Sequence, residues 1–334
     1  MQKLIQKVCS WALLMGLLLN GVPLRAITVA GKQPVAKAAS APSAADELLA
    51  LLPESDVVAV IDVQRAFAEL LPMLKNVSTA GIGKTATEIE TFAKLAGVEP
   101  KQIQAAVIGV KMTETLGRGS GVLLLQGIDV DGTKLTDAVK AMGGELKTAE
   151  HNGKPLFTLS LKRDPNGDAE QTQFALLGNK RLAIGDLPAL KAVLDGSPKG
   201  NPAALGQALK EAKTTGMVRF AGNLPEALRT MLASQGELFE QVAAVKTIFG
   251  SFDLNADNSA TLTARLRTAS ANNAGQLKES LNGLVALGKA FLGGNEDPAL
   301  KLYGQLLEHI KLGVEASDVS LLLQLPKELM DRLK

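Results

Sequence analysis

A corner that recurs along the chain constrains its fold more than any other feature. In each copy a short apolar strand ends at a polar residue, and an amphipathic helix begins shortly afterwards. Val57 to Ile61 lead to Asp62, and 161 positions further on Val218 to Gly222 lead to Asn223. Asp and Asn suit the N-cap of a helix because their side-chain oxygens accept hydrogen bonds from free amides of the first turn. Both corners therefore predict a strand that passes directly into a helix, with Asp62 and Asn223 as N-caps.

Two further copies of the corner indicate that each half of the chain closes as it opens. Leu182 to Gly185 lead to Asp186, and Val319 to Leu323 lead to Gln324. Between the corners, both halves show the same order of a helix, two strands, a helix and a final hairpin. The halves share little identity, so the repeat rests on the order and pattern of its elements. We expect a first α+β repeat over 46–200 and a second over 201–334.

The strand expected over 260–267 indicates how the sheets are built. Leu262, Ala264 and Leu266 alternate with threonine and arginine, which places one face of the strand on a core and the other in water. Asn152-Gly153 is the pair that most readily takes the positive φ angles of a tight hairpin turn. These patterns predict an α+β fold of duplicated strand–helix units, in which helices pack on one side of antiparallel sheets.

The N-terminal segment has the pattern of an export signal followed by a tether. Lysines precede an apolar run from Val8 to Leu24, which is short for a membrane span and is interrupted by asparagine and proline. We expect a signal peptide over 1–30, cleaved after Ala30 or Ala26, and a flexible linker over 31–45. The protein is then periplasmic or secreted. It contacts a membrane only through the signal segment, if this segment is not cleaved.

Cleavage of the signal would change the composition of the chain. Residues 1–30 contain the only cysteine, Cys9, and the only tryptophan, Trp11, so the mature chain is cysteine-free and has no disulfide framework. The full chain has 36 basic and 34 acidic residues, of which the mature chain keeps 33 and 34. This balance excludes nucleic acid as a leading partner. Tyr303 is the only tyrosine, and this scarcity of rings disfavours stacking platforms for bases or sugars.

Two glycine-rich segments resemble catalytic motifs but miss their defining residues. Gly81-Ile82-Gly83-Lys84-Thr85 resembles the end of a phosphate-binding loop, yet Ser78 stands where that loop needs glycine, and the preceding segment is expected to be helical. Gly117-Arg118-Gly119-Ser120-Gly121 has no serine at the centre of a Gly-x-Ser-x-Gly frame, and a hairpin turn explains its glycines.

The histidines and the acidic loops also predict no site. His151 and His309 leave a serine–histidine–aspartate triad open, although no neighbouring residue favours one. With two histidines and no cysteine in the mature chain, a zinc site would need mostly carboxylate ligands. Asp164 to Glu170 and Asp253 to Asp257 carry oxygen side chains at alternate positions, but both lack the twelfth-position glutamate of a calcium loop. We expect solvated turns there, with no metal, no cofactor and no assigned catalytic residue.

The long helix expected over about 274–291 has an apolar face that allows two interpretations. Leu281, Leu284, Leu287 and Phe291 lie on this face at helical spacing. The face could line a lipid groove, but such spacing usually marks burial, so we expect ordinary core.

A short motif carries the one resemblance to known proteins. With Leu52-Pro53-Glu54-Ser55-Asp56-Val57, the chain resembles uncharacterised exported bacterial proteins that open with a similar strand. The resemblance implies export and fold, and it brings no known activity. We therefore hypothesise a non-catalytic binding or scaffolding protein of the cell envelope, with an envelope protein as its partner. One alternative is a carrier of an apolar, lipid-like ligand in a groove between the two halves. Another is a hydrolase whose site is not recognisable.

Overall fold

The structure is a computed structural model whose strands agree closely with the expected ones. It describes residues 43–70, 97, 99–112, 119–129, 132–141, 143–161, 170–196, 203–212, 215–234, 236–257, 259–294 and 298–332. The first half contributes β1 (Val57–Ile61), β2 (Ala105–Met112), β3 (Gly119–Gln126), β4 (Glu145–His151), β5 (Lys154–Leu161), β6 (Glu170–Gly178) and β7 (Arg181–Gly185). The second half contributes β8 (Val218–Asn223), β9 (Thr247–Leu254), β10 (Ala260–Arg267), β11 (Ile310–Glu315) and β12 (Asp318–Leu325).

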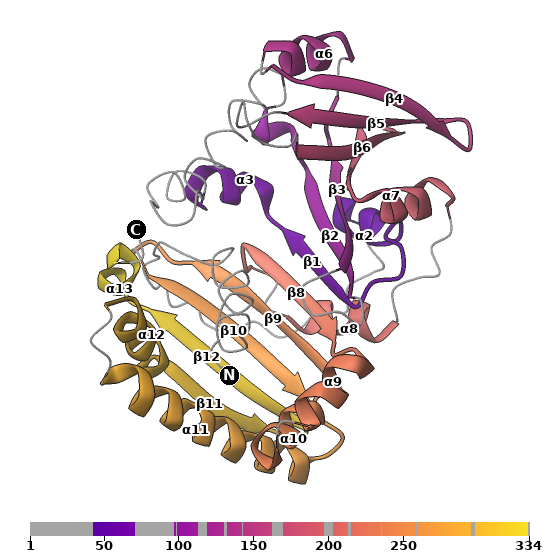
Figure 1. The fold of residues 1–334 in the computed structure, drawn as a ribbon. Coiled ribbons are helices and arrows are strands. Elements are labelled where there is room, and N and C mark those ends of the chain that lie inside the picture. Colours follow the sequence, from indigo (N-terminus) through magenta and orange to yellow (C-terminus); the bar gives the residue numbers. More distant parts are fainter. Residues whose placement is uncertain are drawn as a thin grey trace, which may run out of the picture.

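These strands form one continuous antiparallel sheet (Figure 1). Its 12 strands follow the order β11-β12-β10-β9-β8-β1-β2-β3-β7-β6-β5-β4. The predicted α+β class with antiparallel pairing is therefore confirmed, and the two halves share a single sheet. From the central β1–β8 pair outward, one side continues with β2, β3, β7 and β6, and the other with β9, β10, β12 and β11. The hairpin β4–β5 extends the first side. The duplication itself stays a prediction.

The β1–β8 pair joins the halves at the middle of the sheet. Ala59 lies opposite Phe220, the residue 161 positions further along the chain. Val58 and Ala221, which are paired in the same register, are both buried. Backbone hydrogen bonds and a shared core thus hold the two halves together.

Helices cover the sheet unevenly. Those of the first half and the centre are α2 (Ala44–Leu49), α3 (Val63–Arg65), α6 (Gly132–Ala141), α7 (Leu187–Leu194) and α8 (Ala203–Glu211). Those of the second half are α9 (Glu226–Ala233), α10 (Glu237–Ala243), α11 (Ala271–Gly293), α12 (Pro298–Glu308) and α13 (Lys327–Arg332). Short π-helical and 3-10 turns occupy Ala66–Leu70 and Pro100–Gln102.

The two faces of the sheet are named here after the helices that cover them. On the α7 face, α2, α7 and α8 bury Val107, Leu124 and Phe249 of the strands. On the α11 face, separate clusters pack around α6, α3, α10, α11 and α13. Helices thus cover parts of both faces in both halves, and within the second half α8 lies on the α7 face while α10, α11 and α13 lie on the α11 face. The central strands β2 and β3 are apolar on both faces, so both faces need cover there.

The corners bear out the predicted N-caps in two cases and correct a third. The carboxylate of Asp62 accepts a hydrogen bond from the amide of Arg65 at 3.1 Å, and that of Asp186 accepts one from Ala189 at 3.0 Å. The prediction for Asn223 is wrong. Asn223 ends β8, and its side-chain oxygen accepts a hydrogen bond from the hydroxyl of Thr247 at 3.0 Å. Pairing with β9 therefore extends the strand, and α9 begins three residues later.

Two further local expectations can be compared with the structure. Asn152 and Gly153 take φ angles of 51° and 72°, which confirms the tight turn between β4 and β5. The first described helix, α2, begins at Ala44 with Ser43 as its N-cap, inside the stretch expected to be linker. The expected signal peptide and residues 31–42 of the linker lie outside the described residues.

Arg65 links the two halves through its guanidinium group. It pairs with Glu69 on its own helical segment at 3.1 Å and with Asp253 at the end of β9 at 2.9 Å. It also donates hydrogen bonds to the carbonyl oxygens of Thr215 and Leu254. The side chain is 26% exposed, and α3 is thereby held against the second half of the sheet.

Replacing Arg65 by methionine should destabilise the protein. The apolar stem is kept, but Asp253 and two carbonyl groups lose a charged donor, so we expect the free energy of unfolding to fall by about 2 kcal/mol. Urea denaturation of Arg65→Met against the natural chain measures this. The matched control is Lys147→Met, which removes an exposed surface pair and should leave stability unchanged. Equal effects of the two substitutions would contradict the cross-linking role of Arg65.

Candidate functional site

A polar stretch of the α7 face lies beyond α8, in the second half of the sheet. Here β10, β12 and β11 direct alternate residues away from the core around α11. No described helix packs on these residues in the way that α7 and α8 pack on the neighbouring strands. We call them the polar face, and its members are Thr261, Thr263, Arg265, Arg267, Ser320, Gln324, Lys311 and Glu315. The predicted exposure of one side of the 260–267 strand is thus confirmed.

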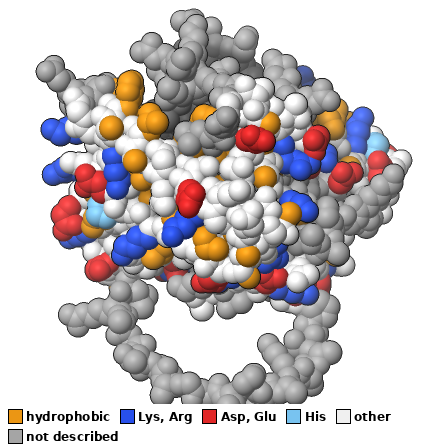
Figure 2. All heavy atoms as spheres, turned by 90° about the horizontal axis from the view of Figure 1, so that it is seen from below, with side chains coloured by type: hydrophobic (Ala, Val, Ile, Leu, Met, Phe, Trp, Pro, Cys, Tyr) orange, Lys and Arg blue, Asp and Glu red, His pale blue; other side chains and the backbone are white. Residues whose placement is uncertain are grey.

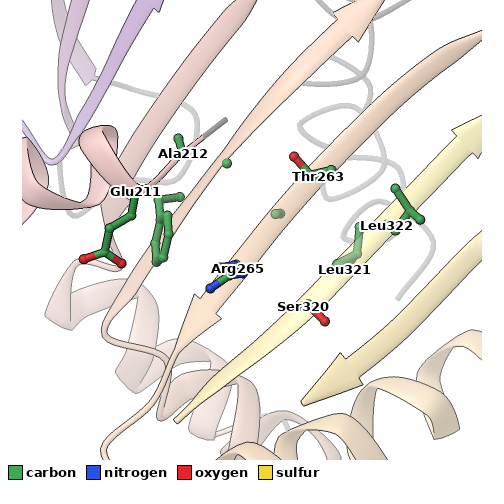
Figure 3. Close-up of a pocket in the computed structure, with 10 residues that line it drawn as sticks. Glu211, Ala212, Thr263, Arg265, Ser320, Leu321 and Leu322 are labelled. Carbon is green, nitrogen blue, oxygen red and sulfur yellow. The ribbon is translucent and has the colours of Figure 1, made fainter. Parts of the chain in front are cut away.

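A hollow of about 310 Å³ lies where the polar face meets the end of α8. Figure 3 shows Glu211 and Ala212 on one side, Ser320 to Leu322 on the other, and Thr263 and Arg265 of β10 between them. The ring of Phe249 adds an apolar wall. The hollow therefore offers one carboxylate, one guanidinium group and two hydroxyl groups around an apolar floor, the composition of a site that orients a polar group.

Arg267 fixes the wall of this hollow. Its guanidinium group donates to both carboxylate oxygens of Asp318 at 2.9 Å and to Glu211 at 2.7 Å. It also lies over the ring of Phe249, 4.8 Å from the centroid. Asp318 is only 5% exposed, so its charge depends on this partner. One side chain thus ties α8 to β9, β10 and β12.

The charges of this network reinforce one another. The hydrogen bonds to Asp318 and Glu211 raise the pKa of Arg267 above its ordinary value, against the effect of burial. The hydrogen bond from Arg267 lowers the pKa of Glu211, also against burial. Both groups therefore stay charged around neutral pH.

The remaining polar groups of the hollow are less constrained. The hydroxyl of Thr263 lies 2.9 Å from that of Ser251, and it donates to the carbonyl oxygen of the same residue. Arg265 pairs with Glu315 of β11 at 2.7 Å, and both side chains are largely exposed. Such a surface pair contributes little to stability, so Arg265 can exchange its partner for a bound group.

A second hollow, of about 280 Å³, lies in the first half beside α7. Its walls include Ser55, Gly109 and Ala189, and its rim carries Lys111. The amine of Lys111 pairs with Glu54 at 2.8 Å and with Asp56 at 3.0 Å. The charge of Lys111 is thus neutralised by two carboxylates that precede β1.

Asp186 holds the neighbouring corner together. Besides capping α7, its carboxylate accepts hydrogen bonds from the hydroxyl of Ser120 and the amide of Gly121. Burial alone would raise the pKa of Asp186, but the hydrogen bonds outweigh it and the pKa is lowered from its ordinary value of 3.8. Ser120 of the glycine-rich segment therefore has a structural partner.

The two histidines cannot meet in one site. His151 ends β4, and His309 precedes β11, so they lie at opposite edges of the sheet. The imidazole of His151 lies 2.6 Å from the carboxylate of Asp195 at the end of α7, to which Asn152 also donates a hydrogen bond. These contacts fasten the β4–β5 turn to α7.

Of the expected acidic turns, one is described. Asp253 is the partner of Arg65, and the amide of Asn255 donates to the hydroxyl groups of Ser259 and Thr261. These groups serve the β9–β10 hairpin. The segments 81–85 and 164–169, and residues 117–118, lie outside the described residues. Across the described ranges, no group of three or more histidine, cysteine or acidic residues is arranged to hold a metal ion.

The expectation of core along the long helix is correct at one end only. Leu281 of α11 packs against the cluster around Leu277 and Val319. Leu287 and Phe291, however, are 63% and 68% exposed. The helix runs past the cluster that its first half covers, so its C-terminal turns keep apolar residues in contact with solvent. No helix in the described ranges has the length and apolar character needed to cross a membrane.

Sequence reasoning missed Arg65, Glu211 and Asp318 as structural groups, and it missed α8. The apolar spacing of Leu205, Ala208 and Leu209 carried a signal for this helix. The ionic partners carried none, because Arg267 lies 51 positions from Asp318 and 56 from Glu211.

Comparison with known proteins leaves the function open. No protein family and no curated protein matches the chain. Among solved structures, crystal form III of TP0453 superposes with a TM-score of 0.49 at 9% identity, over 85% of this chain and 96% of that one. Crystal form I of TP0453 gives 0.45 at 9% identity, over 85% and 95%. These values are too low to carry an argument. The features above define the chain as an α+β protein with one antiparallel sheet and a polar face that carries a hollow.

Removing Arg267 should destabilise the protein through Asp318. Arg267→Leu leaves a buried carboxylate unpaired, and we expect a loss of about 2 kcal/mol. Adding Asp318→Asn removes that charge and should recover about half of the loss. Chemical denaturation of the two variants and of Asp318→Asn alone completes the cycle. If the loss of unfolding free energy in the double variant equals the sum of the losses in the two single variants, Arg267 and Asp318 are not coupled.

The cap at Asp186 should make stability depend on pH in the acid range. Folding lowers the pKa of the Asp186 carboxyl below its ordinary value of 3.8. The contribution of this carboxylate to the free energy of unfolding is therefore present above pH 3.8, and it disappears as the pH falls through the pKa of the folded state. Asp186→Asn keeps one acceptor oxygen but replaces the other, which accepts from Gly121, by an amide nitrogen that cannot accept, so it should cost about 1 kcal/mol at pH 7. The difference from the natural chain should narrow below pH 4, as measured by urea unfolding across a pH series. Asp129→Asn, at an exposed residue, is the control, and a gap at Asp186 that is constant with pH would contradict the assignment.

Proposed function

We propose that the protein is a non-catalytic binding or scaffolding protein of the cell envelope, and that it holds a protein partner on the polar face. The observation that carries the proposal is the hollow of about 310 Å³ between α8 and β12. A hollow of this size lies near the lower limit of small-molecule sites and accommodates one or two side chains of a partner. The envelope is favoured by the pattern of residues 1–30.

The chemistry of the hollow favours binding over reaction. Arg267 is committed to Asp318 and Glu211, so it serves to stiffen the wall. The hydroxyl of Thr263 is bonded to Ser251, another hydroxyl, which cannot act as a general base at neutral pH. Arg265, whose partner is exposed, is the group best placed to meet an incoming carboxylate.

The surface charge supports a protein partner of mixed charge. Figure 2 views the molecule from below and shows basic and acidic side chains intermixed, with hydrophobic ones between them. On the polar face itself, Arg265 of β10 pairs with Glu315 of β11, and Lys311 lies four residues from Glu315 on the same strand. Such alternation gives orientation to a docked protein through complementary charges.

The carrier hypothesis placed its apolar ligand in a groove between the halves. Each of the two hollows is lined by residues of a single half, the larger by the second half and the smaller by the first. The boundary between the halves is occupied by the β1–β8 pair. We therefore favour the protein partner over the carrier. Native mass spectrometry of gently purified protein separates the two, because a carrier retains a lipid-sized mass.

Filling the hollow should weaken capture of the partner. In a pull-down from envelope extract, Ser320→Trp should reduce the retained partner at least fivefold, because the indole occupies the site of the partner's side chain. Lys147→Trp is the control, since it adds the same exposed ring on the opposite edge strand, away from the polar face, and it should capture normally. Equal capture by both variants would place the interface elsewhere. No capture by the natural chain, together with hydrolytic activity of the pure protein, would overturn the proposal.

A further inference from the structure

The two edges of the sheet differ in how they are protected. The edge strand β4 carries Glu145 and Lys147 on one face and Glu150 on the other, and these residues are exposed. Charges on both faces of an edge discourage another strand from pairing with it. The opposite edge, β11, concentrates its charged residues, Lys311 and Glu315, on the polar face. Its other face carries Ile310, Leu312 and Val314.

The exposed large apolar side chains of the described chain belong to β11 and to the helix that packs against it. The large hydrophobic residues that stay exposed are Leu287, Phe291 and Val314. Val314 belongs to β11, and α11, which carries the other two, packs against β11 through Leu281 and Leu312. In Figure 1, α11 runs beside β11 along the outer border of the sheet. A strand edge and an apolar helix face therefore share one border, and such combinations mark interaction sites.

Among the described strands, only β12 pairs with β11, so one side of the β11 backbone is open to a further strand. The amide of Gln324 donates to the carbonyl oxygen of His309, which makes these two residues a hydrogen-bonded pair of the β11–β12 ladder. In an antiparallel ladder such pairs alternate, so Lys311, Gly313 and Glu315 also direct their backbone groups toward β12. Ile310, Leu312 and Val314 consequently direct their amide and carbonyl groups outward, beyond the edge.

The sequence of β11 is complementary to itself. If a second copy pairs antiparallel with the twofold axis at Gly313, Lys311 lies opposite Glu315 of the second copy, and Glu315 lies opposite Lys311. Leu312 and Val314 then exchange outward hydrogen bonds and meet on the other face. Opposite charges and apolar side chains placed directly across a strand pair stabilise it. At the axis, Gly313 of one copy lies opposite Gly313 of the other in a pair that makes no backbone hydrogen bonds. The Cα atoms of such a pair approach closely, and glycine has no side chain to prevent this.

We propose that β11 is a self-association edge, through which two copies of the chain join their sheets around a twofold axis at Gly313. The interface is isologous, since each copy offers the same strand, and it closes after two copies. This proposal stands on the edge strand and does not depend on the partner of the polar face.

A charge swap tests the register of this dimer. Sedimentation equilibrium of the full chain over a concentration series should show a monomer–dimer equilibrium. Lys311→Glu places like charges opposite each other and should raise the dissociation constant of the dimer at least tenfold. Lys311→Glu combined with Glu315→Lys restores opposite charges across the axis and should return the constant to within threefold of the natural value. Lys147→Glu, the same change on the other edge strand, should leave it unchanged.

A backbone variant tests the pairing independently of charge. Val314→Pro removes an outward amide and leaves the bonds to β12 in place, so it should yield a monomer with an unchanged circular dichroism spectrum. If this variant misfolds, the charge swap still decides. A natural chain that stays monomeric at all concentrations would overturn the proposal. It would also fall if Lys147→Glu weakens the dimer, or if the charge swap fails to restore association.

Discussion

The antiparallel pairing of β1 with β8 is the interaction on which the rest of the structure depends. It places Ala59 against Phe220 at the middle of the sheet and gives each half a neighbour where it would otherwise have an unpaired edge. Without this pair, the first half would end at β1 and the second at β8, both with apolar faces and free backbone groups. Sharing them lets two modest sheets bury a common core on the α7 face, and among the described strands it leaves the outer edges at β4 and β11.

Around this seam, two arginines carry the polar connections between distant parts of the chain. Arg65 ties α3 to the end of β9, and Arg267 ties α8 to β10 and β12. A planar guanidinium group can satisfy several carboxylate and carbonyl oxygens at once, and a single side chain therefore fixes several elements. The hollow is thus framed by a rigid network, while Arg265 at its mouth keeps an exposed partner. Rigid walls and one exchangeable group suit recognition.

The two proposed interaction sites use the same few strands for different purposes. The polar face of β10 and β12 presents side chains, and the edge of β11 presents backbone groups. Lys311 and Glu315 belong to both, because they lie on the polar face and at the edge. Pairing two copies through β11 would set two polar faces side by side and present two hollows to one partner, which strengthens binding without any new contact.

The sequence by itself determined the local elements of this protein. The strand over 260–267 has the predicted bounds, Asp62 and Asp186 cap their helices, and Asn152-Gly153 forms its turn. Each of these depends on neighbouring residues, so period, capping and turn chemistry suffice. Tertiary structure alone decided that the halves share one sheet, that Asn223 pairs with Thr247 instead of capping a helix, and that Phe291 stays exposed. It also chose the partners of Arg267, more than 50 positions away. The physical reason is that strand partners and ionic partners are selected by packing across the whole chain, which no local pattern records.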